Sequence, residues 1–204
     1  MGKREFWGVD LETSGTSHER HVPIQLGIGA PNGDYASWLI NGWQWADDCD
    51  GIVGETCWLW DLRAAEIHGL TKEQIDRHGS SPYDVTLQAV EFIERNSKAW
   101  HGERKVVGWN VGSFDMPYLR KHMYGVARKL SYQSADLNAV TFAISEAQGI
   151  SSKHLKRQAQ EAGAAGAYAL TGLGVDEGLH DAGWDAVAAL GAWDYLKSRI
   201  REGY

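Results

Sequence analysis

The sequence has little cysteine and no long apolar run. Its two cysteines, Cys49 and Cys57, have no partner Cys or His at zinc spacing, which argues against a structural zinc site or a disulfide framework. No apolar run is long enough to span a bilayer, and residues 1–5 lead into the first expected strand without an apolar signal core. We therefore expect a cytoplasmic protein with no membrane contact.

The sequence also lacks an excess of positive charge. It has 20 Lys and Arg residues against 27 Asp and Glu residues, which gives a net charge of −7. This balance argues against a protein that coats nucleic acid through a broad basic surface. It is compatible with a nucleic-acid enzyme, because acidic metal ligands add negative charge that bound divalent ions would offset.

Tryptophan is abundant, with ten residues in a chain of 204. Four of them fall in an excursion at about residues 41–61 that shows no steady hydrophobic period. Some tryptophans could serve as platforms for base stacking, although core or interface positions are the commoner use. With 43% hydrophobic residues, the chain has the size of one well-filled domain, and we expect residues 1–204 to form it.

Hydrophobic patterning predicts three antiparallel strands in the first part of the chain. Residues 6–11 are mostly apolar and end in a Thr-Ser-Gly turn, as in a short buried strand. Residues 22–30 and 35–40 flank a Pro-Asn-Gly-Asp turn, which is a hairpin signal.

The rest of the chain alternates helices with strands, which indicates an α/β fold. Helices are expected from Ser81 to about Trp100, after residue 115, over residues 152–162, and after residue 181. Strands are expected at residues 105–110 and 132–137. The Gly- and Ala-rich residues 163–178 favour a loop, although their alanines could prolong the preceding helix.

Two carboxylates lie at the end of the first expected strand. Asp10 and Glu12 are two residues apart, so a strand would point both to the same side. Adjacent carboxylates repel unless a cation or a proton lies between them, and a divalent metal is the usual solution in a nuclease or phosphatase. Alternatively, Glu12 begins a solvated loop and Asp10 caps the turn, and the pair alone favours this second interpretation.

Further candidates lie at the ends of later elements. Asp115 follows an expected parallel strand, where open α/β sheets build their sites. Asp185 lies in the first turns of the last helix, where interaction with the helix dipole is the alternative role, and His180 precedes it by five residues. The helix over residues 152–162 carries Lys153, Lys156 and Arg157, which could contact phosphate but fit a solvated face better.

Four motifs together resemble the DEDDh branch of 3′→5′ exonucleases, the family of the proofreading subunit of bacterial replicative DNA polymerases. The motifs are residues 9–15 (VDLETSG), residues 67–71 (IHGLT), residues 107–119 (VGWNVGSFDMPYL) and residues 180–185 (HDAGWD). Each is weak alone, and the match rests on their order and separation. One departure is Trp109, because the family usually has His at this position. Since that His is not a metal ligand, the change puts a substrate contact in doubt more than the catalytic chemistry.

The resemblance implies a ribonuclease H-like fold with a central mixed five-stranded sheet, three antiparallel strands followed by two parallel ones, flanked by helices. It implies two divalent ions, Mg²⁺ or Mn²⁺, held by four carboxylates, with His180 as general base. The metal ligands would be Asp10, Glu12, Asp115 and Asp185. The implied contacts to the terminal nucleotide are Leu11, Thr13, Ser14, Gly15, His68 and Asn110.

The implied activity is release of nucleoside 5′-monophosphates from single-stranded or frayed 3′ ends of DNA. An oligoribonuclease-type enzyme acting on RNA is the alternative within the enzyme class, because no residue decides how the 2′-hydroxyl is treated. A non-catalytic nucleic-acid-binding module would normally lack a ligand, and this sequence lacks none. The protein could act alone or with a polymerase or another replication or repair protein.

Overall fold

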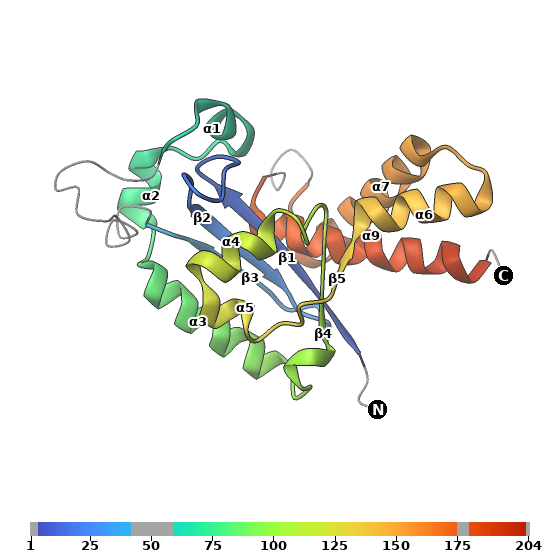
Figure 1. Cartoon of the computed structure of the whole chain (residues 1–204), viewed down its shortest axis with the longest axis horizontal. Helices are drawn as coiled ribbons and strands as arrows, with labels where there is room; N and C mark the ends of the chain where they lie inside the picture. The colour runs from blue at the N-terminus through green and yellow to red at the C-terminus, as the bar shows by residue number, and fades with distance from the viewer. Residues whose placement is uncertain (1–3, 42–58, 175–179, 203–204) are drawn as a thin grey trace.

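The computed structural model describes residues 4–41, 59–174 and 180–202 of the chain. Five strands form one mixed sheet in the order β3-β2-β1-β4-β5 (Figure 1). Strands β1 (Glu5–Thr13), β2 (Pro23–Gly29) and β3 (Tyr35–Leu39) are antiparallel, whereas β4 (Arg104–Gly108) and β5 (Ser134–Asp136) are parallel to β1. The predicted sheet of three antiparallel strands followed by two parallel strands is confirmed.

Helices cover both faces of the sheet. One face packs its apolar side chains against α3, α4 and α5, and the other packs against α6, α7 and α9. The shorter helices α1 and α2 connect β3 with α3 (Figure 1). The bounds are α1 (Leu62–His68), α2 (Lys72–His78), α3 (Pro82–Asn96), the 3₁₀ turn η2 (His101–Glu103), α4 (Asp115–His122), α5 (Tyr124–Ala127), α6 (Leu137–Gln148), α7 (Ser152–Thr171) and α9 (Ala182–Glu202).

Local signals start several of these helices where the sequence predicts them. Thr71 forms a capping box with Gln74 at the start of α2. The Ser81 hydroxyl accepts a hydrogen bond from the Asp84 amide, and Pro82 occupies the first turn of α3. These caps satisfy backbone N–H groups that would otherwise have no partner in the first turn.

Helix α7 corrects the sequence-based expectation for residues 163–178. The helix continues past residue 162 to Thr171. A Cβ atom on Gly163 would lie 2.3 Å from the carbonyl oxygen of Ala188 in α9. The glycine therefore permits close packing of two helices, a requirement that helical periodicity does not reveal. Residues 175–179 lie outside the described residues.

Two smaller expectations differ from the structure in extent. The strand expected at residues 132–137 is limited to β5, Ser134–Asp136. Most of the Trp-rich excursion at residues 41–61 lies outside the described residues, and its final residue, Asp61, caps α1 by accepting a hydrogen bond from the Arg63 amide at 2.8 Å. Within the described ranges, no helix is both long and apolar enough to cross a membrane.

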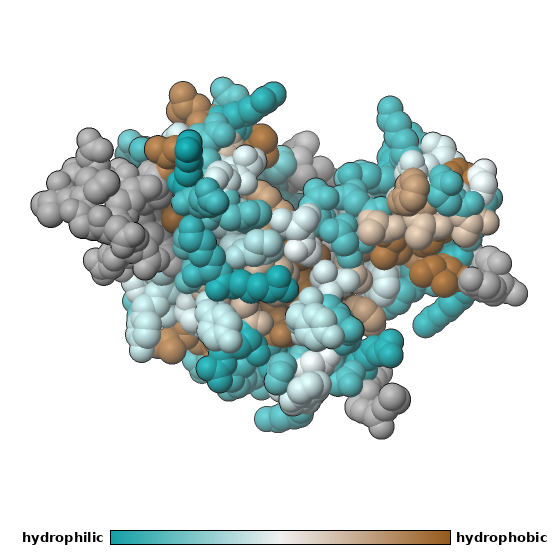
Figure 2. Space-filling model, in the orientation of Figure 1, coloured by the Kyte–Doolittle hydropathy of each residue, from teal (hydrophilic) through white to brown (hydrophobic). Residues whose placement is uncertain are grey.

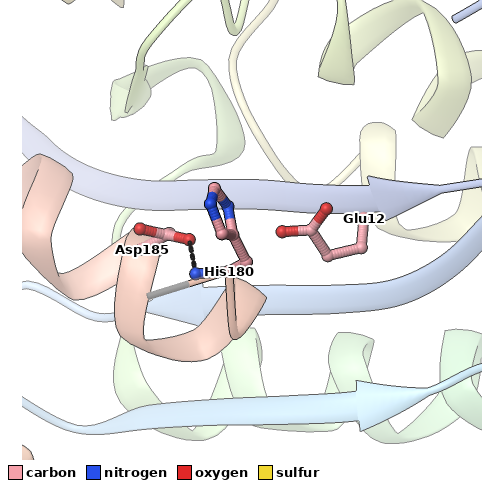
Figure 3. A group of neighbouring side chains, drawn as sticks. All are labelled: Glu12, His180 and Asp185. Carbon is pink, nitrogen blue, oxygen red and sulfur yellow. Dashed lines mark hydrogen bonds between the residues drawn. The ribbon is translucent and has the colours of Figure 1, made fainter. Parts of the chain in front are cut away.

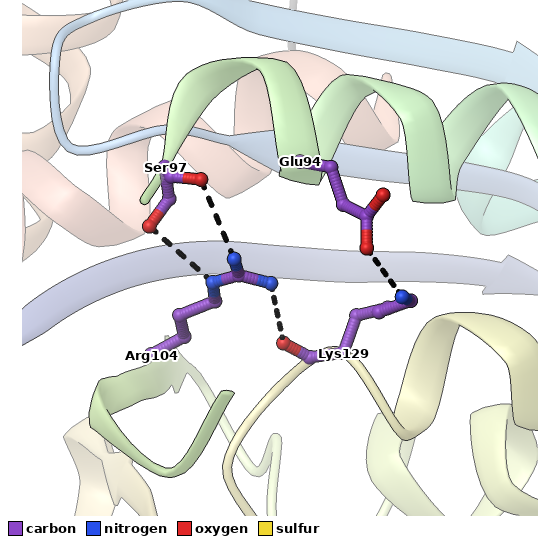
Figure 4. Close-up of polar contacts among 4 residues, drawn as sticks. All are labelled: Glu94, Ser97, Arg104 and Lys129. Carbon is purple, nitrogen blue, oxygen red and sulfur yellow. Dashed lines mark hydrogen bonds and ion pairs between the residues drawn. The ribbon is translucent and has the colours of Figure 1, made fainter. Parts of the chain in front are cut away.

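A buried guanidinium fixes the amino-terminal end of β4. Arg104 donates to the Ser97 hydroxyl at 3.3 Å, to the Ser97 carbonyl at 3.4 Å and to the Lys129 carbonyl at 3.2 Å (Figure 4). The Ser97 hydroxyl in turn donates to Glu5 at the start of β1. A more exposed ion pair joins the Lys129 and Glu94 side chains. This network ties the end of α3 to β1, to β4 and to the segment after α5.

The closest contact between layers is that of α9 with β1 and β2. A Cβ atom on Gly8 would lie 1.9 Å from the Ala186 carbonyl oxygen, and one on Gly27 would lie 1.9 Å from the Ala182 carbonyl oxygen. No other residue type fits these positions unless the helix moves away. The first turns of α9 therefore lie directly on the face of the sheet that carries Asp10 and Glu12, because side chains alternate along β1.

We predict that Gly27→Ala moves the start of α9 away from the sheet. Overpacking of this kind typically destabilises a protein by about 1–3 kcal/mol, which lowers the melting temperature by several degrees for a chain of this length. Calorimetric unfolding would measure the change. Gly166→Ala is the matched control, because its Cβ would meet the nearest atom, Gly191 Cα, at an ordinary 3.6 Å. Equal melting temperatures for the two variants would contradict the packing argument.

Candidate active site

Strand β1, in the centre of the sheet, carries the first two candidate carboxylates near its carboxyl-terminal end. Asp10 pairs with Gly27, and Glu12 pairs with Gln25 across the antiparallel ladder. Both side chains project toward the start of α9, since they share the face of Gly8. The sequence expectation that these two carboxylates point to one side agrees with this register.

Glu12, His180 and Asp185 form a compact group that could hold a metal ion. One ligand atom from each lies within 4.8 Å of the others. In Figure 3 the His180 ring stands between the two carboxylates. The Asp185 carboxylate also accepts a hydrogen bond from the His180 backbone amide at 3.0 Å. This bond fixes His180 in a left-handed conformation, with φ of 64°.

Asp115 joins the group from the other half of the sheet. It begins α4, is 3% exposed, and its carboxylate accepts a hydrogen bond from the Leu11 backbone amide at 2.9 Å. This bond links the segment after β4 directly to β1, between Asp10 and Glu12. The negative charge of Asp115 acts on both of these carboxylates.

Burial is the main cause that raises the pKa of all four carboxyls, and repulsion from nearby carboxylates adds to each shift. Burial, followed by the charges of neighbouring carboxylates, raises the pKa of Asp10 well above its usual value and that of Glu12 to about 8. Burial raises the pKa of Asp115 to about 7 and that of Asp185 to about 6, although backbone N–H donors partly oppose both shifts. Oxygen ligands crowded in this way suit divalent cations, which would remove the repulsion.

Asp181 is a further acidic residue that the sequence reasoning missed. Its carboxylate caps α9 by accepting hydrogen bonds from the Gly183 and Trp184 amides at 3.0 and 3.1 Å. It also accepts a hydrogen bond from the Gln25 side chain at 2.6 Å. Its charge contributes to the raised pKa values of Asp10, Glu12 and Asp185. An Asp directly before a helical pattern is a recognisable N-cap signal.

The turn after β1 uses its own hydroxyls internally. The Ser14 hydroxyl accepts a hydrogen bond from the Val22 amide, and the Thr13 hydroxyl donates to the Gly15 carbonyl. Tyr118 donates to the same carbonyl at 2.7 Å. Thr13, Ser14 and Leu11 are buried. The contact of Leu11, Thr13, Ser14 and Gly15 with a terminal nucleotide stays a prediction. In the structure the Thr13 and Ser14 hydroxyls shape the turn.

His68 lies close enough to His180 for their charges to interact. Burial, and then the charge of His180, lower the pKa of His68. Its Nδ1 accepts a hydrogen bond from the Leu70 amide at 3.0 Å, so the neutral ring carries its proton on Nε2. Nε2 is buried without a hydrogen-bond partner among the described residues. A buried donor of this kind is available to a ligand that enters beside it.

Asn110 has a different environment from His68. It is exposed and has a left-handed backbone, with φ of 60°. Its side-chain oxygen accepts a hydrogen bond from Asn138 at the start of α6, at 2.8 Å. Asn110 thus connects the segment after β4 with the α6 and α7 layer.

Solved structures share this architecture. E. coli Exonuclease I in complex with a dT13 oligonucleotide aligns with a TM-score of 0.67 and 18% identity over 98% of this chain and 42% of the other. The chain shares the fold of that part of Exonuclease I. A moderately thermophilic Exonuclease I from Methylocaldum szegediense aligns with a TM-score of 0.52 and 18% identity over 71% of this chain and 30% of the other.

This chain therefore spans less than half the length of these Exonuclease I proteins. The zinc-bound E. coli ExoI–ssDNA complex aligns similarly, with a TM-score of 0.62 and 16% identity over 99% of this chain and 42% of the other. No family model and no curated protein sequence matches the chain. The ribonuclease H-like α/β prediction is confirmed, and nothing in the comparisons supports a polymerase partner.

We predict a characteristic pH dependence of stability when divalent ions are removed with a chelator. Carboxyls of the unfolded chain titrate near pH 4, whereas those of folded Asp185, Asp115 and Glu12 titrate at about 6, 7 and 8. The folded state therefore binds more protons, and this contribution to stability, complete below about pH 4, is lost as pH rises to about 8. Melting temperature should fall across this range, and less steeply for Glu12→Gln.

Added Mn²⁺ should reverse the fall, because metal binds the deprotonated site and its stabilisation grows with pH. Differential scanning fluorimetry at pH 5 and pH 8, with and without Mn²⁺, measures both effects. Parallel pH profiles for the wild type and Glu12→Gln would contradict the assigned electrostatics.

Proposed function

We propose that the protein is a metal-dependent 3′→5′ exonuclease that releases nucleoside 5′-monophosphates from single-stranded or frayed 3′ ends of DNA. The observation that carries the proposal is the meeting of four carboxylates and His180 where β1 contacts the start of α9. The fold adds support, because E. coli Exonuclease I with this architecture has been solved with bound dT13 and dA16 oligonucleotides. DNA is the proposed substrate for that reason.

The acidic residues suit two divalent ions, Mg²⁺ or Mn²⁺. Asp10 would be the central ligand, because the charges of Asp115, Asp185 and Glu12 all act on it. Glu12 and Asp185 would serve one ion, and Asp115 would support the other. When bound, the ions supply Lewis-acid polarisation of the scissile phosphate and of water. The carboxylates hold those charges in place before the substrate arrives, which avoids reorganisation during the reaction.

His180 is the proposed general base. Its ring lies between Glu12 and Asp185, at the edge of the acidic group. A neutral imidazole there can accept the proton of an attacking water, and the adjacent carboxylates stabilise the imidazolium that results. The bond from its backbone amide to Asp185 holds the residue in position for this transfer.

His68 is the proposed donor to the substrate. Its lowered pKa keeps the ring neutral, and the Leu70 contact assigns the proton to the unpartnered Nε2. A phosphate or sugar oxygen of the terminal nucleotide is a suitable acceptor. Asn110 would contact the same strand through its side-chain amide.

We predict that His180→Ala lowers kcat at least a hundred-fold, since general-base catalysis contributes about 10²–10⁴-fold. The KM for a dT15 oligomer should change little. Steady-state release of dTMP measures both constants, and fluorimetry measures Mn²⁺-dependent stabilisation in parallel. Retained Mn²⁺ stabilisation with lost turnover supports a base. Loss of the Mn²⁺ shift would instead make His180 a ligand.

We predict that Asp10→Asn removes metal-dependent cleavage, because the amide keeps the shape of the side chain but not its charge. The assay follows 5′-labelled dT15 with Mg²⁺, where shortening by single nucleotides identifies 3′→5′ cleavage, and a matched RNA oligomer tests sugar preference. Glu91→Gln on α3 is the control, since this exposed carboxylate lies outside the site. Cleavage by the wild type in excess chelator, or full activity of Asp10→Asn, would contradict the proposal of a metal-dependent exonuclease.

A further inference from the structure

Helices α6 and α7 form a groove that the catalytic group does not use. One part has a volume of about 270 Å³, and an adjoining part has a volume of about 440 Å³. Lys153 and Lys156 line both parts, so the two form a continuous surface. In Figure 2, the lobe that Figure 1 labels α6 and α7 carries hydrophilic side chains at its top beside more hydrophobic ones.

The groove is basic, in contrast to the whole chain. Lys153, His154, Lys156 and Arg157 line it, and no Asp or Glu lies among its lining residues. The chain carries a net charge of −7, so a surface free of acidic side chains departs from its overall character. Arg157 approaches Glu161 at 3.8 Å, but both side chains are about two-thirds exposed, at 66% and 67%, and such a pair is weak. The groove therefore favours an anionic ligand.

Hydrogen bonds connect this groove to the segment that leads from β4 to Asp115. Lys156 donates to the Asn138 side chain at 2.8 Å, and Asn138 donates to Asn110 at 2.8 Å. Asn110 lies five residues before Asp115 in the segment that leaves β4. The Lys156 ammonium also lies 5.0 Å from the centre of the Trp109 ring. Trp109 thus supports a cation of the groove at the position where the resembling family usually has His.

An aromatic side chain lies among these cations. Phe142 on α6 lines the smaller part of the groove and is 61% exposed. Exposed aromatics beside a basic track are the arrangement by which proteins hold single-stranded nucleic acid, because bases stack on the ring while cations contact phosphates. A small inorganic anion has no base that could stack on the Phe142 ring, so the ring favours a nucleic acid as the ligand.

We propose that the α6–α7 groove binds the single strand upstream of its 3′ end, with phosphates at Lys153, Lys156 and Arg157 and a base on Phe142. This inference rests on the proposed function for its direction, since the strand runs from the groove past Asn110 to the carboxylates. The groove lets an acidic chain keep a long substrate while the terminal nucleotide is removed.

The test compares Lys153→Ala/Arg157→Ala with the control Lys98→Ala/Arg128→Ala. Both double variants remove two exposed positive charges, but Lys98 and Arg128 lie beside α3 and α5. Fluorescence anisotropy in excess chelator measures binding of labelled dT15 without cleavage. The groove variant should bind at least ten-fold more weakly than the control, and its salt slope should fall by about 0.7 for each phosphate that the protein no longer neutralises. Phe142→Ala should weaken binding several-fold with an unchanged slope.

Cleavage kinetics then separate this proposal from the proposed activity. For dT15, the factor by which the groove variant raises KM should be at least ten times the factor by which it lowers kcat. For dT3, the increase in KM should be smaller. Equal dT15 affinity and equal KM for the groove and control variants would overturn the groove proposal. The exonuclease proposal would still hold if the wild type cleaves dT15. A wild type that binds dT15 through the groove but cleaves no oligomer would overturn the exonuclease proposal instead.

Discussion

The candidate site depends on the close contact of α9 with strands β1 and β2. Glycines at positions 8 and 27 let two carbonyl oxygens of α9 occupy the space that Cβ atoms would fill. This contact brings His180 and Asp185, from the end of the chain, against Glu12 near its beginning. Weak surface contacts could not hold residues so distant in sequence with the precision that catalysis requires.

The same contact has an electrostatic cost. It crowds carboxylates that burial already disfavours in their charged form, which raises their pKa values. The fold tolerates the crowding because surrounding groups over-determine each position: the Leu11 amide holds Asp115, and the His180 amide holds Asp185. The crowded carboxylates therefore oppose stability, and the divalent ions proposed for this site would relieve their repulsion.

The sequence predicts the strands of the sheet and the shared face of Asp10 and Glu12 well because both follow short-range rules, whereas the grouping of Asp115 and Asp185 with them is expected only from the family resemblance. Alternation assigns Asp10 and Glu12 to one face, and Ser81 with Pro82 starts α3 where expected. The length of α7 does not follow from such rules, because Gly163 reads as flexible until Ala188 is known to lie against it. The proton on Nε2 of His68 likewise depends on a hydrogen bond from the Leu70 amide to Nδ1 that only the fold creates.

The crossing of α7 and α9 has a mechanical consequence. A Cβ atom on Gly191 would lie 3.1 Å from the Cα atom of Gly163, so the two helices meet backbone to backbone. At this crossing point no side chain of Gly163 or Gly191 separates the two helices, so a displacement of one would move the other. A shift of α7 would therefore reach α9, whose first turn carries Asp185.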